Sequence, residues 1–177
     1  MGTIKTTNIE PIADNGTVTL GSSGDTFALA AGVTQTIAVN TPAFAASFVS
    51  SQSIPNVADT KVSFDTILWD TDNAFASSRF TVPSGQGGKY YLQAHTQIPG
   101  IDNLEIGQIM IFINGSHDQL ASVRVASSGD NQIFRMITAY TAELNAGDYV
   151  EIYVYQNSGG AQNAANQFFT GYKLIGV

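Results

Sequence analysis

Residues 148–156 of this chain alternate strictly between two kinds of side chain, directly after the turn signal Asn145-Ala146-Gly147-Asp148. Val150, Ile152 and Val154 point to one side, and three tyrosines and one glutamate occupy the positions between and beside them. A period of two is that of a β-strand with one apolar face. Similar short runs recur along the chain between Gly, Asn, Asp, Ser and Pro, which is typical of antiparallel sandwiches and barrels. We therefore expect an all-β fold with almost no helix.

Two parts of the chain differ in pattern. Residues 1–41 predict a hairpin with Asp14-Asn15-Gly16 at its turn, followed by short β segments that are poor in large apolar side chains. Such a piece is too small to be stable alone, so we expect copies of itself or a partner to stabilise it. Residues 42–177, which we call the head, predict a two-sheet sandwich. Its expected strands lie near 43–50, 61–69, 78–83, 89–97, 107–114, 119–126, 132–143, 148–156 and 167–176.

The expected strands 132–143 and 167–176 are apolar on both faces. A two-sheet sandwich covers one face of each sheet, so the second face of these strands needs other cover. A local flap would supply it, and so would a subunit interface. For the core itself we predict five buried side chains: Trp69, Phe80, Tyr90, Val150 and Ile152.

The composition excludes several classes of protein. Charged residues make up 12% of the chain, the net charge is −7 and there is no cysteine. Disulfide and thiol chemistry are thereby excluded, and without a basic patch we expect no nucleic-acid partner. The longest strongly apolar run, residues 109–113, is too short to cross a bilayer, and no signal peptide is visible at the N-terminus.

No catalytic constellation is visible. The two histidines, His95 and His117, lack the spacing of a metal-ligand pair, and no nucleophile elbow or phosphate-binding loop occurs. Asp102, Asn103, Asp130 and Asn131 could supply oxygen ligands to Ca²⁺, although Asp and Asn are also ordinary turn residues. We therefore predict no metal, no cofactor and no enzymatic activity.

Several stretches of the head carry a family resemblance. These are "TKVSFDTILWDTDNAFASSRFTVP", Gly88-Lys89-Tyr90-Tyr91-Leu92, "LNAGDYVEIYV" and the terminal "FFTGYKLIGV". Together they resemble the globular head of the C1q/TNF-like jelly-roll family, over roughly residues 43–177. The resemblance implies that strands 89–97, 132–143 and 167–176 form an inner sheet around a threefold axis. The trimer-interface residues expected on that basis are Tyr91, Gln93, His95, Tyr140 and Phe168.

The N-terminal stretch "IKTTNIEPIADNGTVTLGSSGDTF" is similar to the N-terminal segments of tailed-bacteriophage fibre and appendage proteins. The two resemblances imply a homotrimeric tail-fibre or capsid appendage that attaches to other virion proteins through residues 1–41. Such a protein is made in the bacterial cytoplasm and located in the virion. The alternatives are a soluble extracellular C1q/TNF-type ligand or lectin, and a glycan depolymerase.

A candidate site for a host-surface glycan or protein follows from strand direction. In an antiparallel head, the loops at 98–106, 127–132 and 156–166 lie at the same end, opposite the C-terminus. Amides, carboxylates and aromatic surfaces suit a sugar or another polar ligand. The alternative is that loop tips collect such residues in any β protein. The expected ligand-binding residues are Asp102, Asn103, Asp130, Asn131, Tyr153, Tyr155, Asn157 and Asn163.

Overall fold

The structure is a computed structural model, and it describes residues 40–48 and 50–175. The expected segment 1–41 lies almost entirely outside these residues. Every regular element in the described part is a strand, which confirms the all-β fold. No helix there is long and apolar enough to cross a membrane.

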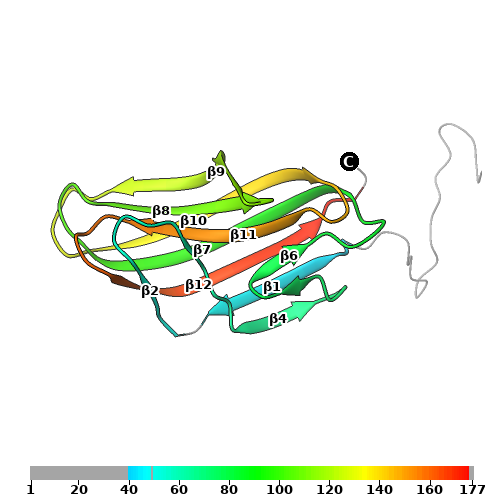
Figure 1. The fold of residues 1–177 in the computed structure, drawn as a ribbon, viewed down its shortest axis with the longest axis horizontal. Coiled ribbons are helices and arrows are strands. Elements are labelled where there is room, and N and C mark those ends of the chain that lie inside the picture. The colour runs from blue at the N-terminus through cyan, green and yellow to red at the C-terminus, as the bar shows by residue number, and fades with distance from the viewer. Residues whose placement is uncertain (1–39, 49, 176–177) are drawn as a thin grey trace, which may run out of the picture. The chain divides into compact units, whose positions relative to one another are not determined.

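The strands form two antiparallel sheets packed face to face, as Figure 1 shows. What we call the inner sheet has the order β10-β7-β12-β1-β4, with β2 beside β12. The outer sheet has the order β5-β6-β11-β8-β9, with β3 beside β11. The strand bounds are β1 Ala43–Phe48, β2 Gln52–Ile54, β3 Thr60–Lys61, β4 Thr66–Asp70, β5 Phe75–Ala76, β6 Arg79–Thr81, β7 Gly88–Ile101, β8 Ile106–Ile113, β9 Ser116–Ala126, β10 Gln132–Leu144, β11 Tyr149–Gln156 and β12 Gln162–Lys173.

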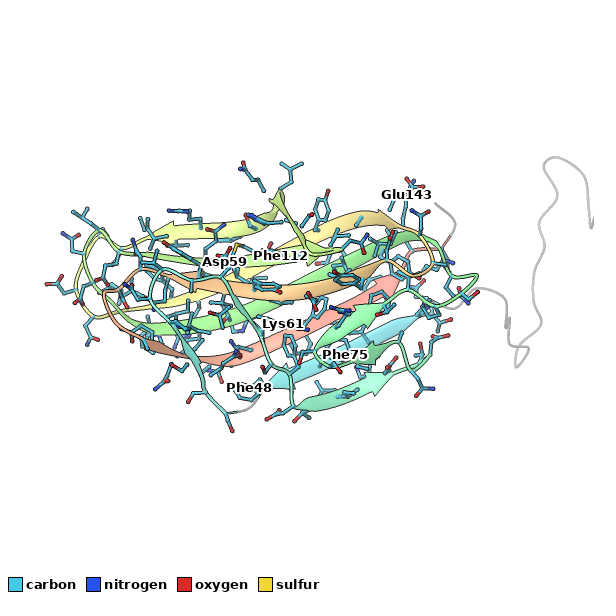
Figure 2. All side chains as sticks on the ribbon, viewed as in Figure 1. Phe48, Asp59, Lys61, Phe75, Phe112 and Glu143 are labelled. Carbon is cyan, nitrogen blue, oxygen red and sulfur yellow. The ribbon has the colours of Figure 1, made fainter. Side chains whose placement is uncertain are left out.

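A cluster of aromatic rings joins the two sheets at the centre of the core. The ring of Phe44, on β1, lies 4.6 Å from Phe80 and 5.1 Å from Phe75, both on the outer sheet, and 4.8 Å from Phe169 on β12. Phe75, on β5, is labelled in Figure 2. Such stacked and edge-to-face pairs add to the free energy gained by burying apolar area.

Gly171 on β12 makes room for this cluster. A Cβ atom at position 171 would lie 2.9 Å from a side-chain carbon of Leu92 and 2.9 Å from one of Phe44. Real Cβ atoms do not approach other atoms so closely, so the absence of a side chain lets β12 pack directly on these two residues. Here a glycine within a strand marks a close approach.

The period of two predicted most of the core correctly. Phe80, Tyr90, Val150 and Ile152 are buried as expected. Burial raises the pKa of the Tyr90 hydroxyl to about 12, with a smaller contribution from the negative charge of Asp72, and the hydroxyl donates a hydrogen bond of 2.6 Å to the carbonyl of Gln86. Tyr90 therefore stays uncharged in the core.

The prediction that Trp69 is buried is wrong, because its side chain is 46% exposed. The expected single strand 61–69 is two strands of opposite sheets: β3 pairs with β11, whereas β4 pairs with β1. The chain changes sheets between them, so the alternation before the crossing does not continue after it. Trp69 lies opposite Ala45 at the edge of the inner sheet, on the face that points away from the core.

The turn signal at residues 145–148 is confirmed. The amide of Asp148 donates to the carbonyl of Asn145, and the Asp148 carboxylate accepts from the Asn145 amide at 2.6 Å. That bond, with a second from the Asn114 side chain, lowers the pKa of Asp148. Asn114 and Gly115, at the β8–β9 turn, have φ angles of 52° and 76°, as a tight hairpin turn requires.

We predict that Phe44→Ala lowers the free energy of unfolding by about 3–5 kcal/mol, because it removes the ring that contacts both sheets. Urea unfolding followed by circular dichroism measures this. Leu104→Ala is the control: Leu104 is 79% exposed, and its truncation should change stability by less than about 0.5 kcal/mol. Equal effects of the two substitutions would contradict the central role of the Phe44 cluster.

Candidate functional site

The face of the inner sheet that points away from the core is partly apolar. Directly opposed residues share a face, and His95 lies between Ile137 on β10 and Phe168 on β12. Ile137 is 54% exposed, and Ile133 and Trp69 are also large exposed apolar residues of this sheet. Tyr91 and Gln93 occupy the same face of β7 as His95, at alternate positions. The structure thus brings four of the five expected interface residues onto one face: Tyr91, Gln93, His95 and Phe168.

Tyr140 does not share that face. It lies opposite Leu92, which is fully buried, and it packs against the core cluster. The residues of β10 that do point outward are those between Phe134, Met136 and Thr138. The alternation along β10 correctly places the Tyr140 side chain on the same face as Phe134, Met136 and Thr138. The expectation that Tyr140 belongs to the trimer interface does not agree with this placement.

The three loops expected at one end do gather there, on the left of Figure 1, opposite the C-terminus. Their polar side chains bond mainly to the loops themselves. The carboxylate of Asp130 accepts the amide of Asn103 at 3.2 Å, and that of Asp102 accepts the amide of Asn131 at 2.7 Å. The Asn157 side chain accepts the amide of Ile106 at 2.6 Å. These contacts tie loop to loop and strand, because backbone donors at a loop tip need acceptors.

Gln156 has a similar structural role in the β11–β12 loop. It is fully buried, its amide nitrogen donates to the carbonyls of Ile54 and Gly160, and its oxygen accepts from the backbone and the hydroxyl of Ser158. Asn163 lies apart from the other loop residues, on β12 opposite Ser53, and is exposed.

The tyrosines of β11 point to the side of the outer sheet that faces away from the core, which we call the outer face. Three rows of opposed residues cross β11, β8 and β9 there. The rows are Tyr155, Gln108 and Arg124; Tyr153, Met110 and Ser122; and Glu151, Phe112 and His117.

An aromatic stack lies at the centre of the outer face. The Phe112 ring is 4.1 Å from that of Tyr153 and 5.5 Å from the imidazole of His117, which is nearly parallel to it. Burial raises the pKa of the Tyr153 hydroxyl, and the negative charge of Glu151 raises it further. Arg79 places its guanidinium 3.9 Å from the centre of the Tyr149 ring, at the β6 side of the face.

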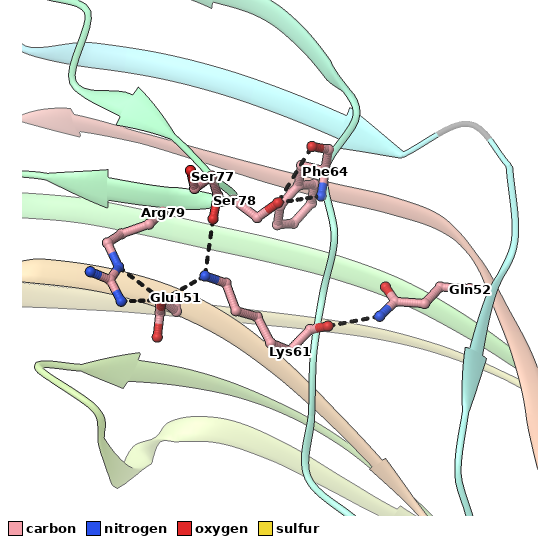
Figure 3. A network of polar contacts seen from close by, with 7 residues as sticks. All are labelled: Gln52, Lys61, Phe64, Ser77, Ser78, Arg79 and Glu151. Carbon is pink, nitrogen blue, oxygen red and sulfur yellow. Dashed lines mark hydrogen bonds and ion pairs between the residues drawn. The ribbon is translucent and has the colours of Figure 1, made fainter.

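Glu151 is buried although it is on this outer face, because two cations cover it (Figure 3). Lys61 contacts Glu151 Oε1 at 2.6 Å and Arg79 contacts it at 2.8 Å. Lys61 also donates to the carbonyl of Ser77. Burial alone would raise the pKa of Glu151, but the hydrogen bonds and positive charges of Lys61 and Arg79 outweigh it, and the pKa is lowered. The carboxylate therefore connects β3, β6 and β11.

The outer face also contains a hollow of about 570 Å³, which we call the outer-face hollow. Figure 2 shows Asp59 and Phe112, which mark this side of the head. Arg124 bonds Gln108 at 3.3 Å and lies 6.0 Å from the Tyr155 ring. Asp59 and Met110 also line the hollow, with six further residues: Gln108, His117, Gln119, Ser122, Arg124 and Tyr155.

Of the expected ligand-binding residues, Tyr155 lines this hollow, whereas Asp102, Asn103, Asp130, Asn131 and Asn157 belong to the loops and Asn163 lies on β12. The remaining lining residues were not expected from the sequence, because most of them lie on the flat of the outer sheet rather than at loop tips. A signal was present: Gln108 interrupts the otherwise apolar β8 at a position that alternates with Ile109 and Ile111. No cluster of three or more His, Asp or Glu residues suited to a metal occurs within the described ranges.

We predict that Glu151→Gln lowers the free energy of unfolding at pH 7 by about 1.5–3 kcal/mol, the range for hydrogen bonds to charged groups. Lys61 and Arg79 are partly exposed and can be hydrated, which limits the cost. Because folding lowers the pKa of Glu151 from its ordinary 4.5, its contribution is present above that pH and is lost as the pH falls through the folded-state value.

Urea unfolding at pH 7 and pH 3 tests this prediction. The stability difference between the parent and Glu151→Gln should shrink at pH 3. The exposed Glu143→Gln is the matched control and should show little difference at either pH. A difference for Glu151→Gln that is the same at both pH values would contradict the proposed state of the carboxylate.

Comparison with known proteins agrees with the architecture. No protein-family model matches the chain. Among curated proteins, the chain is 24% identical over 114 residues to the phage-like element PBSX protein XkdV of Bacillus subtilis (strain 168). The match covers 62% of this chain and spans 17% of the length of that relative.

Among solved structures, the globular domain of zebrafish complement 1qA protein superposes with a TM-score of 0.56 at 18% identity, covering 76% of this chain and 98% of that one. Eiger TNF from S. frugiperda gives a TM-score of 0.52 at 16% identity, covering 77% and 95%. The head therefore has the jelly-roll fold of the C1q and TNF globular domains, in a chain that is similar in sequence to a phage-element protein.

Proposed function

We propose that this chain is a homotrimeric appendage protein of a phage-like particle, on a tail fibre or on the capsid. The head projects from the particle, and residues 1–41 attach it to other virion proteins. Similarity to a phage-element protein supports the assignment to a phage-like particle. The C1q/TNF jelly roll supports a projecting globular head.

The observation that carries the trimer is the apolar face of the inner sheet. Ile133, Ile137 and Trp69 are large, exposed and on one sheet, and Phe168 and Tyr91 lie among them. Exposed apolar patches of this kind mark interaction sites in soluble proteins. Two further copies of the same chain are the occupants we propose, because the inner sheet corresponds to the sheet that the family resemblance puts around a threefold axis.

The head acts, in this proposal, by binding a host-surface ligand rather than by catalysis. Glycoside hydrolysis typically needs two carboxyl groups that flank the scissile bond. In the outer-face hollow, Asp59 is the single carboxylate among the described lining residues. The buried Glu151 is already engaged by Lys61 and Arg79.

We predict that the purified chain is a trimer at micromolar concentration and that Ile137→Asp weakens it at least tenfold, because the change puts a charge on the apolar face. Native mass spectrometry gives the number of chains, and circular dichroism checks that the variant remains folded. Leu104→Asp, on an exposed loop, should leave the trimer intact. A folded monomer of the parent chain at this concentration would refute the trimer.

We also predict that deleting residues 1–40 leaves a folded head that is not incorporated into particles. Thermal unfolding of the truncated chain measures the first part. Immunoblotting of purified particles, made with the truncated or the full chain, measures the second. Normal incorporation of the truncated head would show that attachment does not depend on the N-terminal segment.

A further inference from the structure

We propose that the outer-face hollow is a binding site for an uncharged saccharide. This goes beyond the proposed function, since it assigns a ligand class and a location on the flat of the outer sheet. The hollow measures about 570 Å³, which lies within the range of roughly 300–1,000 Å³ for ligand sites.

The lining of the hollow suits a ligand with many hydroxyl groups. Among the described lining residues, Met110 alone lacks an oxygen or nitrogen on its side chain. Gln108, Gln119 and Ser122 can each donate and accept hydrogen bonds, as sugar hydroxyls also do. Gln108 already accepts from Arg124 and Ser122 already donates to the Gln119 carbonyl, but an apolar ligand would displace water from the remaining donors and acceptors of these groups without replacing its hydrogen bonds, which costs free energy.

The charges in the hollow favour an uncharged ligand. Arg124 supplies donors, and Asp59 supplies an acceptor. Arg124 bonds the neutral Gln108, and the ion pairs of the described residues are those of Glu151. The described lining residues thus include one cation and one anion, and a sugar without an ionised group can bond to both.

Two further observations indicate the same class of ligand, an uncharged saccharide. The Tyr155 ring, beside the Arg124 guanidinium, supplies a flat apolar surface on which the C–H face of a sugar ring can lie. His117 also lines the hollow, and its Nε2 atom is buried without a hydrogen-bond partner among the described residues. Because this nitrogen is hidden from solvent, a ligand hydroxyl reaches it only where the imidazole turns toward the hollow, and the missing partner favours such a bond.

The site is also held rigidly. Its side chains come mainly from three adjacent strands, and the Phe112 stack supports both His117 and the neighbouring Tyr153. A preformed site loses less conformational entropy on binding than a loop does. The described lining residues lie on the outer sheet or in the segment before β3, away from the inner-sheet face proposed for the trimer, so we expect saccharide binding not to require the trimer, whereas a role for it in host attachment rests on the proposed function.

The methionine methyl groups allow a direct test. Met110 lines the hollow, and Met136 is in the core. The full chain labelled with ¹³C at the methionine methyls would be titrated with maltose, lactose and N,N′-diacetylchitobiose, and separately with glucuronic acid. We expect at least one uncharged disaccharide to shift the Met110 signal in a saturable way and to leave the Met136 signal in place.

Variants then locate the binding. Tyr155→Ala removes the ring surface and Arg124→Met removes the cation, and we expect each to weaken binding at least tenfold. Lys89→Met is the matched control for lost charge. Lys89 is exposed and lies at the end of β7 that is opposite the loops 98–106, 127–132 and 156–166, so this variant should bind as the parent does. Methyl spectra without ligand verify that each variant is folded.

The result that would overturn the proposal is a Met110 signal that no uncharged disaccharide shifts up to tens of millimolar. A shift caused by glucuronic acid alone would overturn the assignment to uncharged sugars, and unchanged binding in both hollow variants would overturn the location. Native mass spectrometry on the same sample separates this result from the proposed function. A trimer without sugar binding refutes the site alone, and a sugar-binding monomer refutes the trimeric appendage alone.

Discussion

The contact of Phe44 with rings from both layers is the interaction on which the rest of the head depends. It joins β1 and β12 of the inner sheet to β5 and β6 of the outer sheet, and Gly171 leaves space for it. Once one face of each strand is committed to this core, the period of two assigns every other residue to a surface. The chemistry of the two outward faces is therefore a consequence of the core.

Much of this could be predicted from the sequence, because alternation reports which side of a strand is buried. Tyr90 and Val150 followed the pattern. Trp69 did not, because the chain changes sheets before it, and no local pattern reveals a crossing. Glu151 could not be predicted as buried either, since Lys61 is ninety positions away in the sequence and covers it only in the fold. The outer-face hollow depends on the same long-range register.

The polar residues of the loops and those of the outer face have different roles in the head. At the end of the head opposite the C-terminus, the side chains of Asp102, Asp130 and Asn157 accept hydrogen bonds from backbone amides and so hold the loops together. On the outer face, Gln108 and Arg124 project from strands whose backbone groups already pair within the sheet. Polar side chains in the loops are therefore engaged by backbone amides, whereas similar polar side chains on the outer face remain available for a ligand.

Assembly of several copies of the chain would also affect the two outward faces differently. If three heads meet through the apolar inner-sheet faces, three copies of the outer-face hollow point away from the common axis. If each hollow also binds a sugar, as proposed, a surface covered with repeated sugars meets several sites on one rigid body, and avidity can exceed the affinity of a single site by about 10²–10⁴. Each hollow can therefore be shallow and weak, while a particle bearing many heads is held firmly and still dissociates one contact at a time.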